Sequence, residues 1–188
     1  ASLSYGGSTT ITVNVVDANA SNALLQTPTS VLFSSACSVN DLATIGASAV
    51  SSAGTATVNY SATSCSGSDT ITATLESATS TVASVTFSIS SLGLGTGSEG
   101  TFATGAMSTS TGATPLSYGG DTVVSVNVVD TADNSLFTSS AVAVNFTSNC
   151  VQSGDSTIDA SVNTTTGTAV ATYSAKCRNI ERISSSGT

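Results

Sequence analysis

The chain has 188 residues, and its formal net charge of −8 comes from eleven acidic and three basic side chains, with no histidine. Three cations cannot neutralise a row of phosphates, so we expect neither nucleic acid nor an anionic membrane surface as a partner. Since histidine is the usual base for a serine or cysteine nucleophile, its absence speaks against that chemistry. No apolar run approaches the roughly 18 residues that span a bilayer.

The sequence contains two copies of one pattern. "LSYGG" occurs at 3–7 and again at 116–120, a spacing of 113 residues, and each copy runs into "VNVVD". Neighbouring stretches also match: "VLFSSAC" with "VNFTSNC", and "GTATVNYSATSC" with "GTAVATYSAKC". A repeat of this length has the size of a small β domain, which predicts two tandem modules.

The first module is predicted over residues 1–91. Tyr5 is expected to pack in the core, and the Gly-Gly pair after it to form a tight turn before the main strand. Period-2 alternation of apolar residues predicts strands at 9–17, 29–34, 47–51, 55–63, 70–75 and 82–89. The residues expected to face inward are Ile11, Val13, Val15, Val31, Phe33, Tyr60, Ile71, Ala73, Leu75, Val85, Phe87 and Ile89.

The Gly-rich stretch 92–97 is predicted to be a short linker, and the second module to cover 98–188. Tyr118 repeats Tyr5 and is expected to pack in the same way. Strands are predicted around 121–130, 142–146, 156–162 and 168–175, with inward residues that match those of the first copy: Val124, Val126, Val128, Val142, Val144, Phe146 and Tyr173. Six to seven short strands per module describe an all-β fold of two antiparallel sandwiches.

The end of the second copy departs from the first. Cys65 is followed by two predicted strands, whereas Cys177 is followed by "RNIERISSSGT". We therefore expect the second module to lack its last strand, being either truncated or completed by another chain. An open sheet edge of this kind favours self-association or strand addition.

Each copy holds one pair of cysteines at matching places, Cys37 with Cys65 and Cys150 with Cys177. We predict a disulfide within each module, which implies an oxidising compartment. Free buried thiols are the alternative. A metal site is not expected, because no C-x-x-C motif or histidine completes a ligand set.

Acidic residues offer the remaining candidate chemistry. Asp155 and Asp159 lie close in sequence, but they occur in only one copy and flank a predicted strand, so we interpret them as surface residues. Asp17 and Asp130, with Asp133 and Asn134, could offer oxygens to calcium. Turn formation by Asx side chains explains the same residues without a ligand. We predict no catalytic, metal-binding or cofactor-binding residues.

The aligned pattern "TVNVVD…VxFxSxC…GTAxxxYSAxxC…SDTITATL" resembles the bacterial Ig-like (Big) domains that stand in tandem in invasin- and intimin-type surface adhesins. The likeness covers nearly the whole chain. It implies an Ig-like sandwich for each module and a rigid spacer role at the bacterial cell surface. The implied partners are neighbouring Ig-like domains of the same or another chain, with any host or surface receptor bound elsewhere. The antibody pattern is absent, since there is no tryptophan.

The functional hypothesis is a non-enzymatic stalk segment of a secreted or surface-anchored adhesin, extracellular and without cofactors. Two alternatives stay open. One is a binding module that uses loops at one end of a domain for a carbohydrate or a host receptor. The other is a filament subunit assembled by strand exchange.

Overall fold

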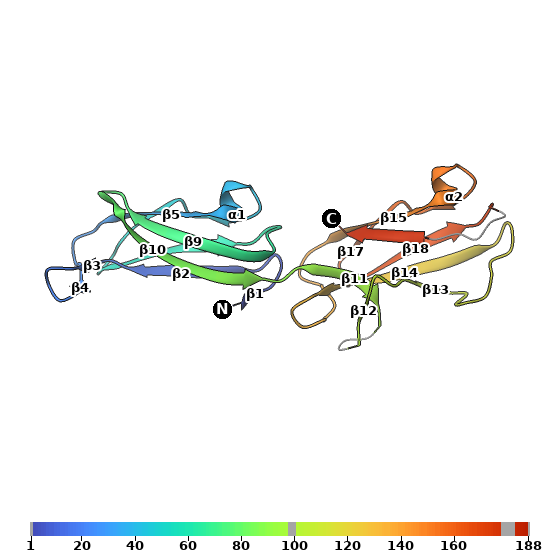
Figure 1. Cartoon of the computed structure of the whole chain (residues 1–188), viewed down its shortest axis with the longest axis horizontal. Coiled ribbons are helices and arrows are strands. Elements are labelled where there is room, and N and C mark those ends of the chain that lie inside the picture. Colours follow the sequence, from blue (N-terminus) through green and yellow to red (C-terminus); the bar gives the residue numbers. More distant parts are fainter. Residues whose placement is uncertain (1, 98–100, 178–182, 188) are drawn as a thin grey trace. The chain divides into compact units, whose positions relative to one another are not determined.

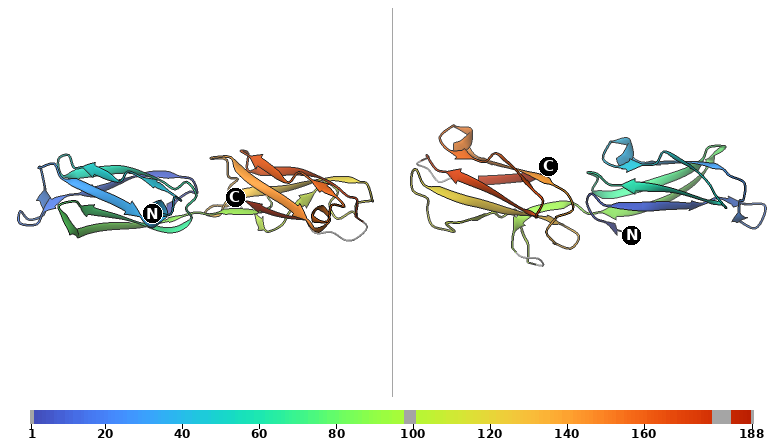
Figure 2. Two further views of the ribbon diagram at one scale, coloured as in Figure 1. Left: turned by 90° about the horizontal axis from the view of Figure 1, so that it is seen from above. Right: turned by 180° about the vertical axis from the view of Figure 1, so that it is seen from behind.

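A computed structural model describes residues 2–97, 101–177 and 183–187 and divides the chain into two compact units, Ala1–Ser91 and Leu92–Thr188. In each unit strands of two sheets lie over one another as layers, with a short helix at a corresponding place (Figures 1 and 2). Apart from two short helices, the regular elements are strands, so the fold is all-β.

Unit 1 has one sheet of order β2-β8-β6 and a second of order β1-β10-β9-β5-β7. The first sheet consists of β2 (Ser8–Asn14), β8 (Thr55–Ser61) and β6 (Thr44–Ile45). The second consists of β1 (Ser2–Leu3), β10 (Ala78–Ile89), β9 (Gly67–Leu75), β5 (Ser30–Ser35) and β7 (Ser48–Val50). A small hairpin, β3 (Val16–Asp17) with β4 (Ala23–Leu24), and the helix α1 (Ala36–Val39) complete it.

Unit 2 repeats this plan with changes at the sheet edges. One sheet has the order β12-β11-β14-β18-β16, with β13 also pairing β14, and the other has the order β17-β15-β19. The elements are β11 (Leu92–Thr96), β12 (Ala103–Thr104), β13 (Ser108–Thr109), β14 (Asp121–Asp130), β15 (Val142–Ser148), α2 (Asn149–Gln152), β16 (Thr157–Ile158), β17 (Ser161–Thr164), β18 (Thr168–Ser174) and β19 (Ile183–Gly187).

The strand order is that of an immunoglobulin-like sandwich. In unit 1, β2 and β8 share one sheet, and β5, β9 and β10 share the other. This is the partition of strands B and E from strands C, F and G in Ig-like domains. Except for the short β1, which runs parallel to β10, the pairs are antiparallel. The predicted Ig-like fold class is therefore observed.

The core of each unit is formed by the inward-facing residues of both sheets. In unit 1 the phenol ring of Tyr60 meets the ring of Phe87 edge to face, with centroids 5.2 Å apart. Such a pair adds about 0.5 to 1.5 kcal/mol to the free energy gained from burial. In unit 2 Val124, Val126 and Val128 on β14 are almost fully buried. Period-2 alternation thus places the predicted faces correctly in the central strands.

The prediction of a linker at residues 92–97 is wrong for its first five residues. Leu92–Thr96 forms β11, which pairs antiparallel with β14 and belongs to unit 2. The glycines permit this, because a Cβ on Gly95 would lie 2.7 Å from Cζ of Phe102. The glycines that suggested a flexible linker instead belong to a strand, where the absence of a side chain leaves room for the ring of Phe102.

The tail after Cys177 contributes a strand that the sequence did not predict. Ile183–Gly187 forms β19 and pairs with β15, so that Ile183 lies opposite Ser148. In unit 1, Ile71 of β9 lies opposite Ser35 in the same way. β19 therefore takes the place of β9. No strand in the described part of unit 2 corresponds to β10.

Two residues expected in the core are exposed. Tyr118 is 68% exposed, whereas its counterpart Tyr5 is partly buried. Val85 has the inward parity of Phe87 and Ile89 but is 45% exposed. No described strand covers the opening between β10 and β2 at that level.

The sequence analysis missed both helices. Ser35 caps α1 by accepting a hydrogen bond from the Ser38 backbone N–H, while the Ser38 hydroxyl accepts one from the Ser35 backbone N–H. Ser148 caps α2 through the backbone N–H of Val151. A serine followed three residues later by a second serine is a weak form of the capping box, and a four-residue helix has no apolar period to detect.

Candidate functional site

Asp155 and Asp159 are exposed and engaged in local structure. The Asp155 carboxylate accepts a hydrogen bond of 2.8 Å from the Ser153 hydroxyl in the turn after α2. The Asp159 carboxylate accepts one of 2.8 Å from the backbone N–H of Thr172 on β18. Both side chains hold the connection between α2 and β17, which fits their interpretation as surface residues.

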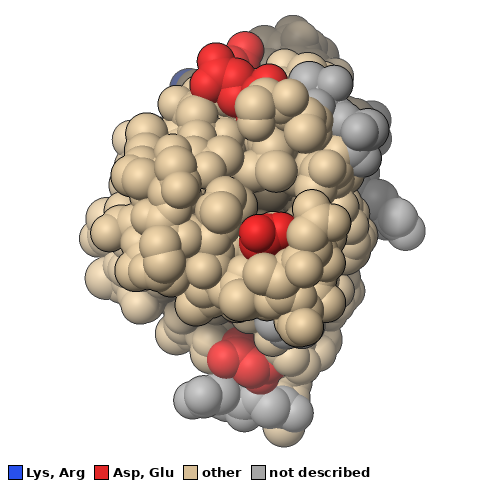
Figure 3. Space-filling view, turned by 90° about the vertical axis from the view of Figure 1, so that its left-hand side faces the viewer, with Lys and Arg blue, Asp and Glu red and all other residues tan. Residues whose placement is uncertain are grey.

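The three aspartates among the four candidate calcium ligands form Asx turns. Asp17 accepts a hydrogen bond from the backbone N–H of Asn19, and Asp130 accepts one from Ala132. Asp133 accepts one from Ser135, and this bond lowers the pKa of the Asp133 carboxyl below its ordinary value. Figure 3 shows acidic side chains of one face in separate groups among uncharged residues.

Side-chain atoms of a possible ligand set come together at one place among the described residues. The sulfurs of Cys37 and Cys65 and a carboxylate oxygen of Asp69 lie within 4.8 Å of one another. The two sulfurs are joined in a disulfide, so neither is a thiolate that could bind a metal. The cluster is a structural cross-link next to a buried acid.

The disulfide of unit 1 joins α1 to the segment between β8 and β9 and is nearly inaccessible to solvent. Cys37 is 9% exposed and Cys65 is 1% exposed. Cys150 and Cys177 form the equivalent bond in unit 2, between α2 and the segment after β18, and both are only partly buried. Each bond links the two sheets of its unit. In unit 1 it joins the helix after β5 to the segment after β8, and in unit 2 it joins the helix after β15 to the segment after β18.

Asp69 is a buried acid that the sequence analysis did not single out. Its Oδ2 accepts a 2.7 Å hydrogen bond from the Tyr60 hydroxyl, and its Oδ1 accepts hydrogen bonds from the backbone N–H groups of Thr70 and Cys37. The pKa of Tyr60 is strongly raised, mainly because the phenol is buried and also because it donates a hydrogen bond to Asp69. Asp69 has the same strand parity as Ile71 and Ala73, a signal that could have placed it inside.

Unit 2 replaces this acid with a hydroxyl. The Tyr173 hydroxyl donates a 3.1 Å hydrogen bond to Oγ of Ser156, which also accepts one from the backbone N–H of Lys176. Because the two units meet the same buried tyrosine with different partners, the arrangement serves stability in both and is not a duplicated reactive site.

No helix among the described residues combines the length and apolar character needed to cross a membrane. No protein-family model matches the sequence, and no curated protein sequence matches it.

Among solved structures, the chain is similar to the D0-D1 domain of intimin, with 18% identity, 98% of this chain and 85% of that chain covered, and a TM-score of 0.36. It is similar to the adhesin InvE of Yersinia pseudotuberculosis, with 15% identity, coverage of 100% and 55%, and a TM-score of 0.42. It is also similar to the Escherichia coli adhesin FdeC, with 19% identity, coverage of 98% and 55%, and a TM-score of 0.39. The chain spans about half the length of the last two.

Proposed function

We propose that this chain is a non-enzymatic structural segment of an extracellular or surface-anchored bacterial adhesin, in which two Ig-like units act as a spacer. The observation that carries the proposal is the duplication of a cross-linked sandwich: Cys37–Cys65 and Cys150–Cys177 occupy equivalent places in the two units. Disulfides persist in oxidising compartments, which supports an extracellular location.

The cross-links suit a segment that bears tension. The two cysteines joined in unit 1 are 28 residues apart in the sequence, and the chain between them cannot extend while the bond is intact. At roughly 3.5 Å per extended residue, each bond withholds about 10 nm of chain. A spacer with such bonds lengthens less when it unfolds under load, because the enclosed loop does not bear the force.

Force spectroscopy on the full chain tests the mechanical part of the proposal. We expect two unfolding events under oxidising conditions, and each event should lengthen by about 10 nm after reduction. A chain that extends fully in oxidising buffer would show that the cross-links do not form, and the argument for an extracellular spacer would fail.

Binding measurements separate the spacer from the loop-based binding module. Beads coated with the chain should bind neither cultured host cells nor glycan arrays in a saturable way. The matched variant carries Asp155→Ala and Asp159→Ala in the connection between α2 and β17. Saturable binding that this variant loses would replace the spacer proposal with the binding module.

A further inference from the structure

The two units differ at one edge of equivalent sheets. β2 pairs with β8 so that Thr9 lies opposite Tyr60, and β14 pairs with β18 so that Thr122 lies opposite Tyr173. The strands are thus equivalent residue by residue. β14 also carries β11 on its other side, whereas β2 has no strand there within residues 2–97, 101–177 and 183–187.

In unit 2, β11 fills the opening between the two sheets. Its residues lie opposite β14 in the pairs Leu92 with Asp130, Gly93 with Val129, Leu94 with Val128, and Gly95 with Asn127. The side chain of Leu94 reaches β19 of the facing sheet, because a Cβ on Gly187 would lie 3.8 Å from its Cδ1. Leu94 therefore closes the side of the sandwich.

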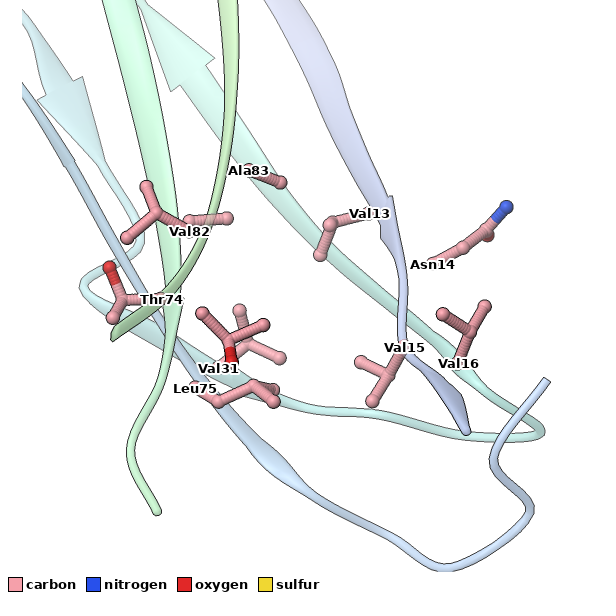
Figure 4. Close-up of a pocket in the computed structure, with 11 residues that line it drawn as sticks. Val13, Asn14, Val15, Val16, Val31, Thr74, Leu75, Val82 and Ala83 are labelled. Atoms are coloured by element: carbon pink, nitrogen blue, oxygen red, sulfur yellow. The ribbon is translucent and has the colours of Figure 1, made fainter. Parts of the chain in front are cut away.

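In unit 1, an apolar groove lies at the corresponding place. Figure 4 shows Val13 and Val15 of the β2 segment facing Leu75 of β9 and Ala83 of β10 across this hollow. Val15 corresponds to Val128, the residue opposite Leu94. Leu75 corresponds to Gly187, since each pairs with the matching valine of its sheet, Val31 or Val144. The groove is where a leucine equivalent to Leu94 would lie.

Exposure of the matched residues shows what the missing strand would cover. Val129 is 2% exposed beside β11, whereas its counterpart Val16 is 42% exposed. Val126 is 1% exposed, whereas its counterpart Val13 is only partly buried. On the other wall of the groove Ala83 is exposed, and Val85, the next inward-facing residue of β10, is 45% exposed.

We propose that this groove is a strand-acceptor site. Its occupant is an extended segment with the chemistry of Leu92–Thr96, alternating leucine and glycine, that runs antiparallel to β2 and places its second leucine opposite Val15. The backbone would pair with β2, because the Val15 N–H donates to Gly54 O on the β8 side and the Asn14 amide faces the open edge. The inference stands independently of the spacer function.

The test supplies this segment in tethered form. The full chain is extended at its N-terminus by a copy of residues 92–113, which precede "LSYGG" in unit 2 as they would precede it here. A tether makes the pairing intramolecular. We expect unit 1 to melt at a higher temperature and the Asn14 amide to exchange at least about tenfold more slowly, because exchange then requires release of the added strand.

Two controls test the assigned geometry. An extended chain whose copied leucine, equivalent to Leu94, is replaced by aspartate should behave like the original chain. Ala83→Glu in the groove should abolish the effect of the extension, whereas Val82→Glu, at the neighbouring residue whose side chain points out of the sandwich, should preserve it.

The synthetic peptide of residues 90–98 provides the untethered probe. Hydrogen exchange of the full chain with saturating peptide should show protection at β2, and Ala83→Glu should remove this protection. Protection at β19 alone, displacement of β11 from β14, or no protection by peptide and tether would each overturn the proposal.

Discussion

The hydroxyl of Tyr60 donates a 2.7 Å hydrogen bond to the carboxylate of Asp69, and both side chains are almost completely buried. Tyr60→Phe leaves the carboxylate inside the sandwich with one partner fewer. A hydrogen bond to a charged group contributes about 1.5 to 3 kcal/mol, so unit 1 should lose stability of that order. Tyr173→Phe in unit 2 removes a bond to a neutral hydroxyl and should cost about 1 kcal/mol. Chemical denaturation of both variants measures the difference, and equal losses would contradict it.

The same pair predicts how unit 1 responds to alkaline pH. Burial and the bond to Asp69 raise the pKa of Tyr60 above its ordinary value of 10.0. The unfolded phenol releases its proton near pH 10, and the native one retains it, so the unfolded state binds fewer protons above that pH. The contribution of Tyr60 to stability is therefore fully present below pH 10 and declines as pH rises beyond it.

Ultraviolet absorbance of tyrosinate follows this titration. Tyr60 should ionise only together with the unfolding of unit 1. In Tyr60→Phe the unfolding free energy of unit 1 should depend less steeply on pH above 10. Ionisation of every tyrosine in the folded chain would refute the pairing.

The disulfides should differ in their reactivity toward reductant. Cys37 and Cys65 are buried, while Cys150 and Cys177 are partly exposed, so the bond in unit 2 should be reduced first. Intact-mass measurement after alkylation should find no reactive thiol before reduction, then two, then four. Replacing both Cys37 and Cys65 by alanine should cost unit 1 about 3 to 4 kcal/mol in the chain-entropy model. Four alkylated thiols in the unreduced protein would contradict the cross-links.

Ile71 and Ile183 occupy equivalent places on β9 and β19 but differ in burial. Ile71 is 1% exposed, and Ile183 is only partly buried. Ile71→Ala should therefore destabilise unit 1 by about 2 to 4 kcal/mol. Ile183→Ala should destabilise unit 2 by about 1 kcal/mol or less, because the side chain of Ile183 buries less apolar surface on folding than that of Ile71. Denaturation curves resolved by unit check the ranking, and a larger loss at Ile183 than at Ile71 would contradict it.

Burial in the central strands could be predicted from the sequence, because such a strand has a pairing neighbour on each side. Burial at the sheet edges could not be predicted in this way. Period-2 alternation identifies Val124, Val126 and Val128 as inward residues, and they are buried. The same pattern gives Val85 an inward parity, yet burial also needs a covering strand, which no local pattern reports. Gly93 and Gly95 have the composition of a linker, and their packing partner, Phe102, lies beyond a loop, where no local pattern reveals the contact. Asp69 was overlooked because its partner, Tyr60, comes from the facing sheet.

The repeat in the sequence and the unit of folding begin at different points. β11 precedes the second "LSYGG", so it lies inside the first 113-residue period although it belongs to the second sandwich. Homologous recombination between the two "LSYGG" stretches would excise one period and join Ser2 to Leu116. The product would retain β14 and lose β11, leaving Val126, Val128 and Val129 without their covering strand. A repeat counted from "LSYGG" therefore separates β11 from the sandwich that it completes, whereas a repeat counted from Leu92 keeps the strand and its sandwich together.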